Sequence, residues 1–107
     1  MIITPASTIA GHRVVKTVGL VRGNTIRARH LGRDILAGLK NIVGGEIEEY
    51  TKMMAEAREQ AVDRMMAEAT QLGANAVTDV RFMTSFIMGA ASEILAFGNA
   101  VVVEPEP

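Results

Sequence analysis

The stretch SEILAFGNAVVVEP, residues 92–105, carries apolar side chains on both faces of an expected strand. Successive side chains of a strand point to opposite faces. One face would hold Ile94, Ala96, Gly98, Ala100 and Val102, and the other would hold Leu95, Phe97, Asn99, Val101 and Val103. A chain of 107 residues has little material with which to cover both faces of a sheet. The pattern therefore raises the question of what packs against the second face.

The strongest helical pattern runs from Glu46 to Leu72, without proline or internal glycine. Residues with high helix propensity dominate it, and Gly73 follows as a stop. One apolar stripe is formed by Ile47, Tyr50, Met54, Ala57, Ala61, Met65 and Leu72. A helix of this length spans about 40 Å at the usual rise of 1.5 Å per residue. A helix of this length is longer than a compact domain of 107 residues can cover with its own sheet.

The N-terminal half predicts a strand followed by a second helix. Residues 1–8 look irregular, and the β-branched run from Ile9 to Leu20 predicts a strand. Gly23-Asn24 predicts a turn or bulge, after which TIRARH extends or re-pairs the strand. Apolar residues at helical spacing predict a helix over residues 30–43, ended by Gly44-Gly45.

Two further strands complete the predicted architecture. Residues 76–88 alternate, and even-numbered residues from Ala76 to Phe86 are expected to share one face. GAAS then turns the chain into an antiparallel strand over residues 94–103. The chain is predicted to be one domain, residues 1–107, of the α+β class. We expect a β-α-α-β-β subunit whose small, mainly antiparallel sheet packs on one long helix.

The two-sided apolar strand predicts that this subunit assembles into a ring. One helix covers one sheet face, so partner subunits of a closed homo-oligomer would supply the cover for the other. The alternative is a sheet that curls around its own helix and hides both faces.

Composition narrows the chemistry further. The chain has no cysteine, which excludes disulfides, a cysteine nucleophile and thiolate metal sites. Its formal net charge of −1 gives no overall attraction to nucleic acid or to an anionic membrane. The N-terminus MIITPASTIAG lacks the basic region of a secretory signal, and the longest apolar run is too short to span a bilayer. We expect a soluble, cytoplasmic protein without a membrane partner.

Neither a metal site nor a catalytic site is predicted. His12 and His30 are isolated, and the methionine pairs Met53-Met54 and Met65-Met66 are adjacent, so they do not face each other on a helix. Core filling explains the methionines better than ligation does. The serines lack a nucleophile-elbow context, and the acids after Gly45 suit a helix start. We therefore expect that the protein is not an enzyme. A metal site remains open in one form only: a ring could bring together one metal ligand from each subunit at its axis.

Several motifs together resemble the YbjQ-like family of small bacterial and archaeal proteins. They are RDILAGLKNIVGGEIEEYTKMMAEAREQAVDRM, LGANAV and GNAVVVE, in that order along nearly the whole chain. The resemblance implies a dodecin-like β-α-β-β subunit that forms a ring, which is expected to be a pentamer. It also brings a family label of heavy-metal binding. The chain departs from the family at Asp79, where glycine is common, and at Met83, where an acid is common. Phe97 and Asn99 replace a common tyrosine and threonine.

The expected function is small-ligand binding or a structural scaffold, with any ligand held between subunits. Candidate ligand-binding residues are Arg33, Asp34, Tyr50, Asp79 and Arg81. No cofactor is specified. One alternative is a metal-binding protein. Another is an anion or nucleic-acid binder that uses an arginine-rich belt formed by Arg22, Arg27, Arg29 and Arg33 together with His30. No aromatic residue interleaves this belt, so nucleic acid is not the expected partner.

Overall fold

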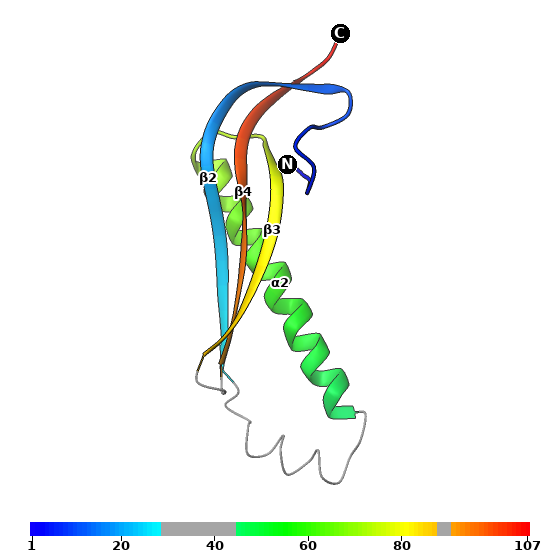
Figure 1. Ribbon diagram of the computed structural model, residues 1–107, viewed down its shortest axis with the longest axis vertical. Helices are drawn as coiled ribbons and strands as arrows, with labels where there is room; N and C mark the ends of the chain where they lie inside the picture. The colour runs from blue at the N-terminus through cyan, green and yellow to red at the C-terminus, as the bar shows by residue number, and fades with distance from the viewer. Residues whose placement is uncertain (29–44, 88–90) are drawn as a thin grey trace.

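The computed structural model describes residues 1–28, 45–87 and 91–107 (Figure 1). The elements in these ranges are β1 (Ile2–Ile3), β2 (His12–Ala28), α2 (Gly45–Gln71), β3 (Ala76–Ile87) and β4 (Ala91–Pro105). The predicted α+β class, with a small and mainly antiparallel sheet on one long helix, is confirmed. The helix expected over residues 30–43 lies outside the described residues.

The sheet has four strands in the order β1-β3-β4-β2. Strand β4 lies in the middle and runs antiparallel to both β3 and β2, as the predicted hairpin requires. Strand β1 runs parallel to β3, with Ile2 opposite Ala76 and Ile3 opposite Val77. The irregular segment expected over residues 1–8 therefore contains a short strand, which the few residues involved did not reveal.

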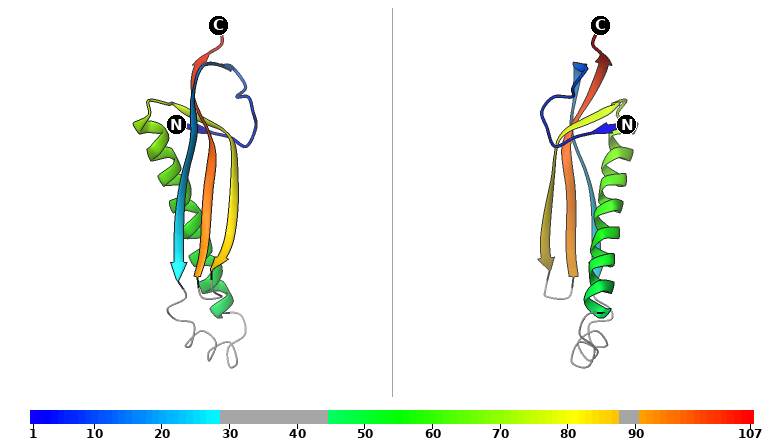
Figure 2. Two further views of the ribbon diagram at one scale, coloured as in Figure 1. Left: turned by 60° about the vertical axis from the view of Figure 1, so that its left-hand side comes forward. Right: turned by 90° about the vertical axis from the view of Figure 1, so that its right-hand side faces the viewer.

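Helix α2 runs along one side of the sheet (Figures 1 and 2) and ends one residue before the predicted position. Gly73 has a φ of 86°, a left-handed conformation that glycine adopts at low cost. The Gly73 N–H donates to the Thr70 carbonyl at 3.0 Å, and the Ala74 N–H donates to the Ala69 carbonyl at 3.0 Å. These two bonds form a Schellman motif, so the helix stop predicted at Gly73 is confirmed.

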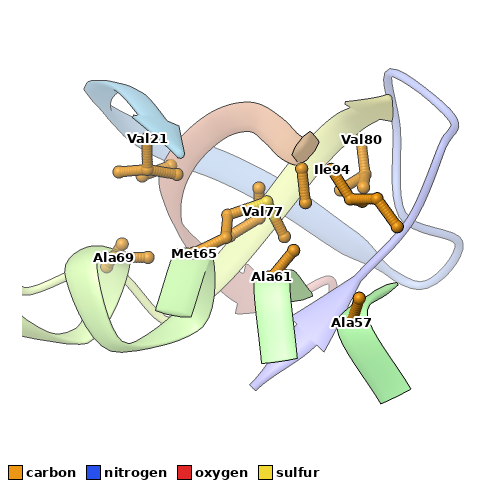
Figure 3. Packing of buried hydrophobic residues seen from close by; sticks show 11 residues of the cluster. Val21, Ala57, Ala61, Met65, Ala69, Val77, Val80 and Ile94 are labelled. Carbon is orange, nitrogen blue, oxygen red and sulfur yellow. The ribbon is translucent and has the colours of Figure 1, made fainter. Parts of the chain in front are cut away.

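Small side chains of α2 bring the helix close to β2 and β4 (Figure 3). The buried cluster contains Val21, Ala57, Ala61, Met65, Ala69, Ala74, Val77, Val80, Ile94, Ala96 and Ala100. At Gly23 the approach is so close that a Cβ atom would lie 2.7 Å from Cβ of Arg64 and still nearer to the backbone of Ala61 and Met65. Glycine is thus required here for helix packing.

The turn or bulge predicted at Gly23-Asn24 is wrong. Gly23 pairs with Ala96 and Asn24 pairs with Leu95 within an uninterrupted stretch of β2. The register shifts of β2 lie earlier, between Val14 and Lys16 and between Thr17 and Gly19. Gly23 is needed for its close contact with α2, and it does not mark a change of chain direction.

A β-bulge at Asp79 interrupts the alternation of β3. Thr78 lies opposite Asn99 and Arg81 lies opposite Phe97, so two residues of β3 face a single residue of β4. The extra residue exchanges the two faces beyond the bulge, and both Val77 and Val80 belong to the core cluster under α2. The predicted common face for the even-numbered residues Ala76 to Phe86 is therefore wrong.

The face of the sheet that points away from α2 is only partly covered. Near the C-terminal end of β4, Ile9 packs against Ala76, Val101 and Val103. Farther along the same face, Leu20, Ile26 and Met83 are 62%, 59% and 55% exposed. The two apolar faces predicted for β4 are confirmed, and the described residues leave part of the second face open.

Within the ranges that the structure describes, no helix is long and apolar enough to cross a membrane.

Candidate functional site

Asp79 lies at the centre of a polar cluster on the bulge of β3. Its Oδ1 accepts a hydrogen bond from Ser7 Oγ at 2.7 Å, and its Oδ2 accepts from Thr78 Oγ1 at 2.9 Å and from Asn99 Nδ2 at 3.3 Å. The bond from Ser7 contributes most to lowering the pKa of Asp79, followed by the bond from Thr78. Loss of solvent raises this pKa by less than either bond lowers it, and Asn99 and the nearby charge of Arg81 lower it a little further. Asp79 is therefore held as a carboxylate.

Arg81 and the backbone of the bulge fasten the N-terminal segment to β3. Arg81 Nη1 donates to the carbonyls of Pro5 at 2.8 Å and Val80 at 2.9 Å. The Asp79 N–H donates to the Ala6 carbonyl at 3.0 Å. A carboxylate that already accepts three bonds is a weak general base, because each donor stabilises its charged form. This geometry supports a positioning role for the cluster rather than acid–base chemistry.

The five predicted ligand-binding residues have different outcomes. Asp79 and Arg81 are close enough for the arginine charge to lower the pKa of Asp79, and the prediction that they bind a ligand stays a prediction. Tyr50 belongs to α2, but its side chain is outside the described residues, as are Arg33 and Asp34 entirely. Ser7 and Asn99, which complete the cluster, were missed as site residues. Ser7 is distant in sequence from Asp79, and no local sequence pattern indicates the hydrogen bond between them.

A second group of polar residues lies on the open face of the sheet. Arg22 on β2 and Arg81 on β3 are both cross-strand neighbours of Phe97 on β4. Residues opposite one another in a sheet project to the same face, so Phe97 lies between two arginines. No described side chain forms a hydrogen bond or ion pair with Arg22. The sequence missed this row because it depends on the register between three strands.

The arginine-rich belt does not continue along one face of β2. Arg22 lies on the open face, whereas Arg27 Nη2 donates to Oε1 of Gln60 on α2 at 2.8 Å and so points to the helix side. His30, Arg29 and Arg33 lie outside the described residues. Among the two belt residues that the structure describes, Arg22 lies beside an aromatic side chain, Phe97, and Arg27 lies opposite Ser92.

A groove runs between α2 and β3 on the other side of the sheet. Its larger part, about 510 Å³, is lined by Ala55, Arg58, Glu59, Val62, Asp63, Met66 and Phe82. A smaller part of about 230 Å³ shares Val62 and Phe82 and extends to Ile3, Thr4, Pro5 and Val80. Phe82 is 50% exposed in this groove. An exposed aromatic ring in a groove is typical of a surface that another molecule covers.

Metal ligands do not gather in the part of the chain that the structure describes. There, no three side chains of the His, Cys, Asp or Glu type come together. His12 Nδ1 lies 3.1 Å from the Ala10 carbonyl, which as an acceptor places the proton on Nδ1. Met65 is fully buried and fills the core, as predicted. These residues do not fit a metal centre within one described chain.

Comparison with known proteins places the chain among proteins of undetermined function. Residues 1–104 match a family profile, YbjQ, described as "Putative heavy-metal-binding". A UPF0145 protein from Dehalococcoides mccartyi is 61% identical over 97% of this chain and 100% of its own length. UPF0145 proteins from Methanosarcina acetivorans and Pyrococcus abyssi are each 55% identical, over 96% and 99% of this chain and 97% and 93% of theirs.

One solved structure has a similar fold. It is a protein of unknown function from Pediococcus pentosaceus, assigned to the DUF74 family, with a TM-score of 0.65 at 15% identity. The alignment covers 97% of this chain and 98% of that one. At this level of identity the similarity concerns the fold alone.

Proposed function

The chain belongs to the YbjQ family, and we propose that it is a non-enzymatic homo-oligomer that closes into a ring. This role differs from the heavy-metal binding in the family's description, because the described residues do not form a metal centre. The resemblance to the family suggests five subunits, and the proposal includes a cytoplasmic location for the assembly. A single observation carries the proposal. Large apolar side chains are exposed on both faces of the sheet, including Leu20, Ile26, Phe82, Met83 and Phe86.

Self-association explains this exposure better than a monomer does. Phe86 is 71% exposed and Phe82 is 50% exposed, although both are large aromatic side chains. Soluble monomers seldom expose several large apolar groups close together, since burying each stabilises the protein by about 1.5–3 kcal/mol. A second copy of the chain is the simplest partner for these side chains, because it is present wherever the chain itself is made.

Native mass spectrometry of the protein purified without chelator tests this proposal. We expect one closed oligomer and no population of free monomer at micromolar concentration. A monomer alone would overturn the proposal. A discrete additional mass on the oligomer would identify a bound ligand: a metal by its isotope pattern, an organic ligand by its mass.

The second candidate function is binding of a small anion on the open face. The observation that favours it is the row formed by Arg22, Phe97 and Arg81, because guanidinium groups bind phosphate and carboxylate and an aromatic ring offers a stacking surface. In a ring the row repeats in every subunit, which concentrates positive charge. The ligand class would be a small organic phosphate, held between subunits.

Titration with adenosine monophosphate and with inorganic pyrophosphate tests the anion-binding function. We expect binding that weakens as salt is raised and that is lost in Arg22→Ala. Arg13→Ala is the matched control, because Arg13 lies on the same strand but pairs with Glu104 at 2.7 Å. Equal binding by both variants would exclude the row as the site. A rise in melting temperature with zinc or copper would instead favour the metal-binding alternative.

A further inference from the structure

Both outer edges of the sheet are open in the described part of the chain. Strand β2 forms one edge and pairs only with β4. On the other side, β1 and the bonds of Thr4 and Ala6 cover the outer edge of β3 only as far as Val80. Among residues 1–28, 45–87 and 91–107, nothing pairs with the outer edge of residues 81–87. Such an edge presents backbone N–H and C=O groups that a strand of another chain can bind.

The β3 edge is apolar and lies beside a groove that contains two acidic side chains and one arginine. Phe82 and Phe86 project on the helix side of this edge, and Met83 projects on the other. The neighbouring groove contains Glu59 and Asp63, for which the described chain offers no hydrogen-bond or ion-pair partner, and Arg58, so that one net negative charge lies there. This edge therefore offers apolar contacts together with negative charge.

The β2 edge has the opposite character. Residues 12–28 contain four lysine and arginine side chains, Arg13, Lys16, Arg22 and Arg27, and no acid. Arg13 is paired with Glu104 on β4, so the uncompensated positive charge comes from the other three. On α2 beside this edge, Arg64 Nη1 donates to the Asn24 carbonyl at 2.6 Å, which places a further positive charge along the seam between α2 and β2. Leu20 and Ile26 add exposed apolar surface on the open face.

We propose that the β2 edge of one copy pairs with residues 81–87 of β3 in the next copy, so that the ring is closed by a continuous sheet. This inference rests on the proposed homo-oligomer and specifies its contact. Strands β2 and β3 are both antiparallel to β4, so they run in the same direction and meet as parallel neighbours when copies are related by rotation. A contact between two different surfaces is head-to-tail, which is the geometry that closes rings.

Charge and shape make a second copy the best occupant of the β3 edge. The basic seam of one copy would lie beside Glu59 and Asp63 of the next, and these two acids outnumber the single arginine of the groove, Arg58. The hydrocarbon stem of Arg64 would cover Phe82 of the neighbour, and its guanidinium group favours an aromatic face. The same alignment brings Met83 of one copy to the side on which Leu20 and Ile26 of the other lie.

Two variants, each blocking one edge, test the head-to-tail contact. Phe82→Asp places an acid in the β3 groove, and the double substitution Arg22→Asp with Arg64→Asp makes the β2 edge acidic. We expect each variant alone to be monomeric by native mass spectrometry. Mixed in equal amounts, they are expected to form a heterodimer and nothing larger, because one intact β3 edge then meets one intact β2 edge.

The control is Leu72→Asp, an equally polar change at an apolar side chain that is 53% exposed beyond the end of α2. This variant is expected to keep the subunit number of the wild type. Circular dichroism verifies that each variant is folded. If Phe82→Asp does not fold, Phe86→Asp, at a more exposed side chain, gives the same readout.

The outcomes separate this inference from the broader proposal. A monomeric wild type would overturn both, as would a wild type that carries a foreign peptide instead of a second copy. An oligomeric wild type whose subunit number is unchanged by both edge variants would leave the homo-oligomer standing and overturn the edge pairing. Oligomers larger than a dimer in the mixture would show that the contact is not head-to-tail.

Discussion

At the scale of single residues, Asp79 combines an uncommon backbone conformation with a satisfied charge. Its φ of 56° lies in the left-handed region, which few residues other than glycine, asparagine and aspartate occupy. Asp79 adopts this conformation at the bulge, and the hydrogen bonds from Ser7, Thr78 and Asn99 hold its carboxylate in place. A glycine at this position would supply the conformation without the bonds.

Neutralising Asp79 should therefore weaken the fold in a pH-dependent way. The pKa of Asp79 in the folded chain is below its ordinary value of 3.8, so its charge stabilises the fold above pH 4, and this contribution is lost as the pH falls through the lowered pKa. Asp79→Asn, which tolerates the same φ, should melt at a lower temperature than the wild type at pH 7. The difference should shrink on acidification toward pH 3.

Thermal melts of both proteins from pH 7 to pH 3 measure the effect. Glu106→Gln, near the C-terminus, controls for the loss of one negative charge. A difference in melting temperature between wild type and Asp79→Asn that stays constant across this range would contradict the role given to the charge.

At the scale of elements, the packing of α2 on β2 depends on the absence of a side chain at Gly23. A Cβ atom there would overlap the backbone of α2 at Ala61 and Met65, which cannot move aside as a flexible side chain can. Gly23→Ala should reduce the free energy of unfolding by about 1–3 kcal/mol, the usual cost of overpacking. Chemical denaturation measures it, and Asn24→Ala, on the opposite face of β2, is the control. An equal loss in both variants would contradict the packing argument.

The elements also show which features a sequence can predict. Helix α2 was predicted within one residue at each end, because its propensity, its periodicity and its Gly73 stop agree. The faces of β4 were predicted correctly because its alternation continues from Ile94 to Val103. The faces of β3 were not, because the bulge at Asp79 depends on pairing with β4 and on contacts with residues 4–7. An alternating pattern contains no sign of an inserted residue.

The candidate site was predictable only in part for the same reason. Asp79 and Arg81 stood out as charges on a strand, and the structure brings them together. Ser7 and Asn99 join them from distant parts of the chain, and Arg22 meets Phe97 only through the register of β2 on β4. Such contacts are set by tertiary structure, so a single sequence offers candidate residues but not their partners.

At the scale of the whole molecule, the described residues form a subunit with apolar side chains exposed on both faces of the sheet and with two unlike edges. Helix α2 and the N-terminal segment cover part of the sheet, while Phe82, Phe86 and Leu20 stay exposed. If other copies cover these groups, folding and assembly are coupled. The stability of the chain then depends on the concentration of the protein, because mass action favours the oligomer over the unfolded monomer.

The melting temperature of the wild type should accordingly rise as the protein is concentrated. When unfolding and dissociation occur together, each tenfold increase in protein concentration raises the free energy of unfolding of the oligomer by about 1.4 kcal/mol for every subunit that is released. The reason is that mass action favours the associated state over separate unfolded chains. Scanning calorimetry over a hundredfold range of concentration measures this dependence. The Phe82→Asp variant should melt at a temperature independent of concentration, since its copies do not associate. A wild type that shows no dependence would mean that the subunit is stable by itself, and that its exposed aromatic side chains serve some partner other than a second copy.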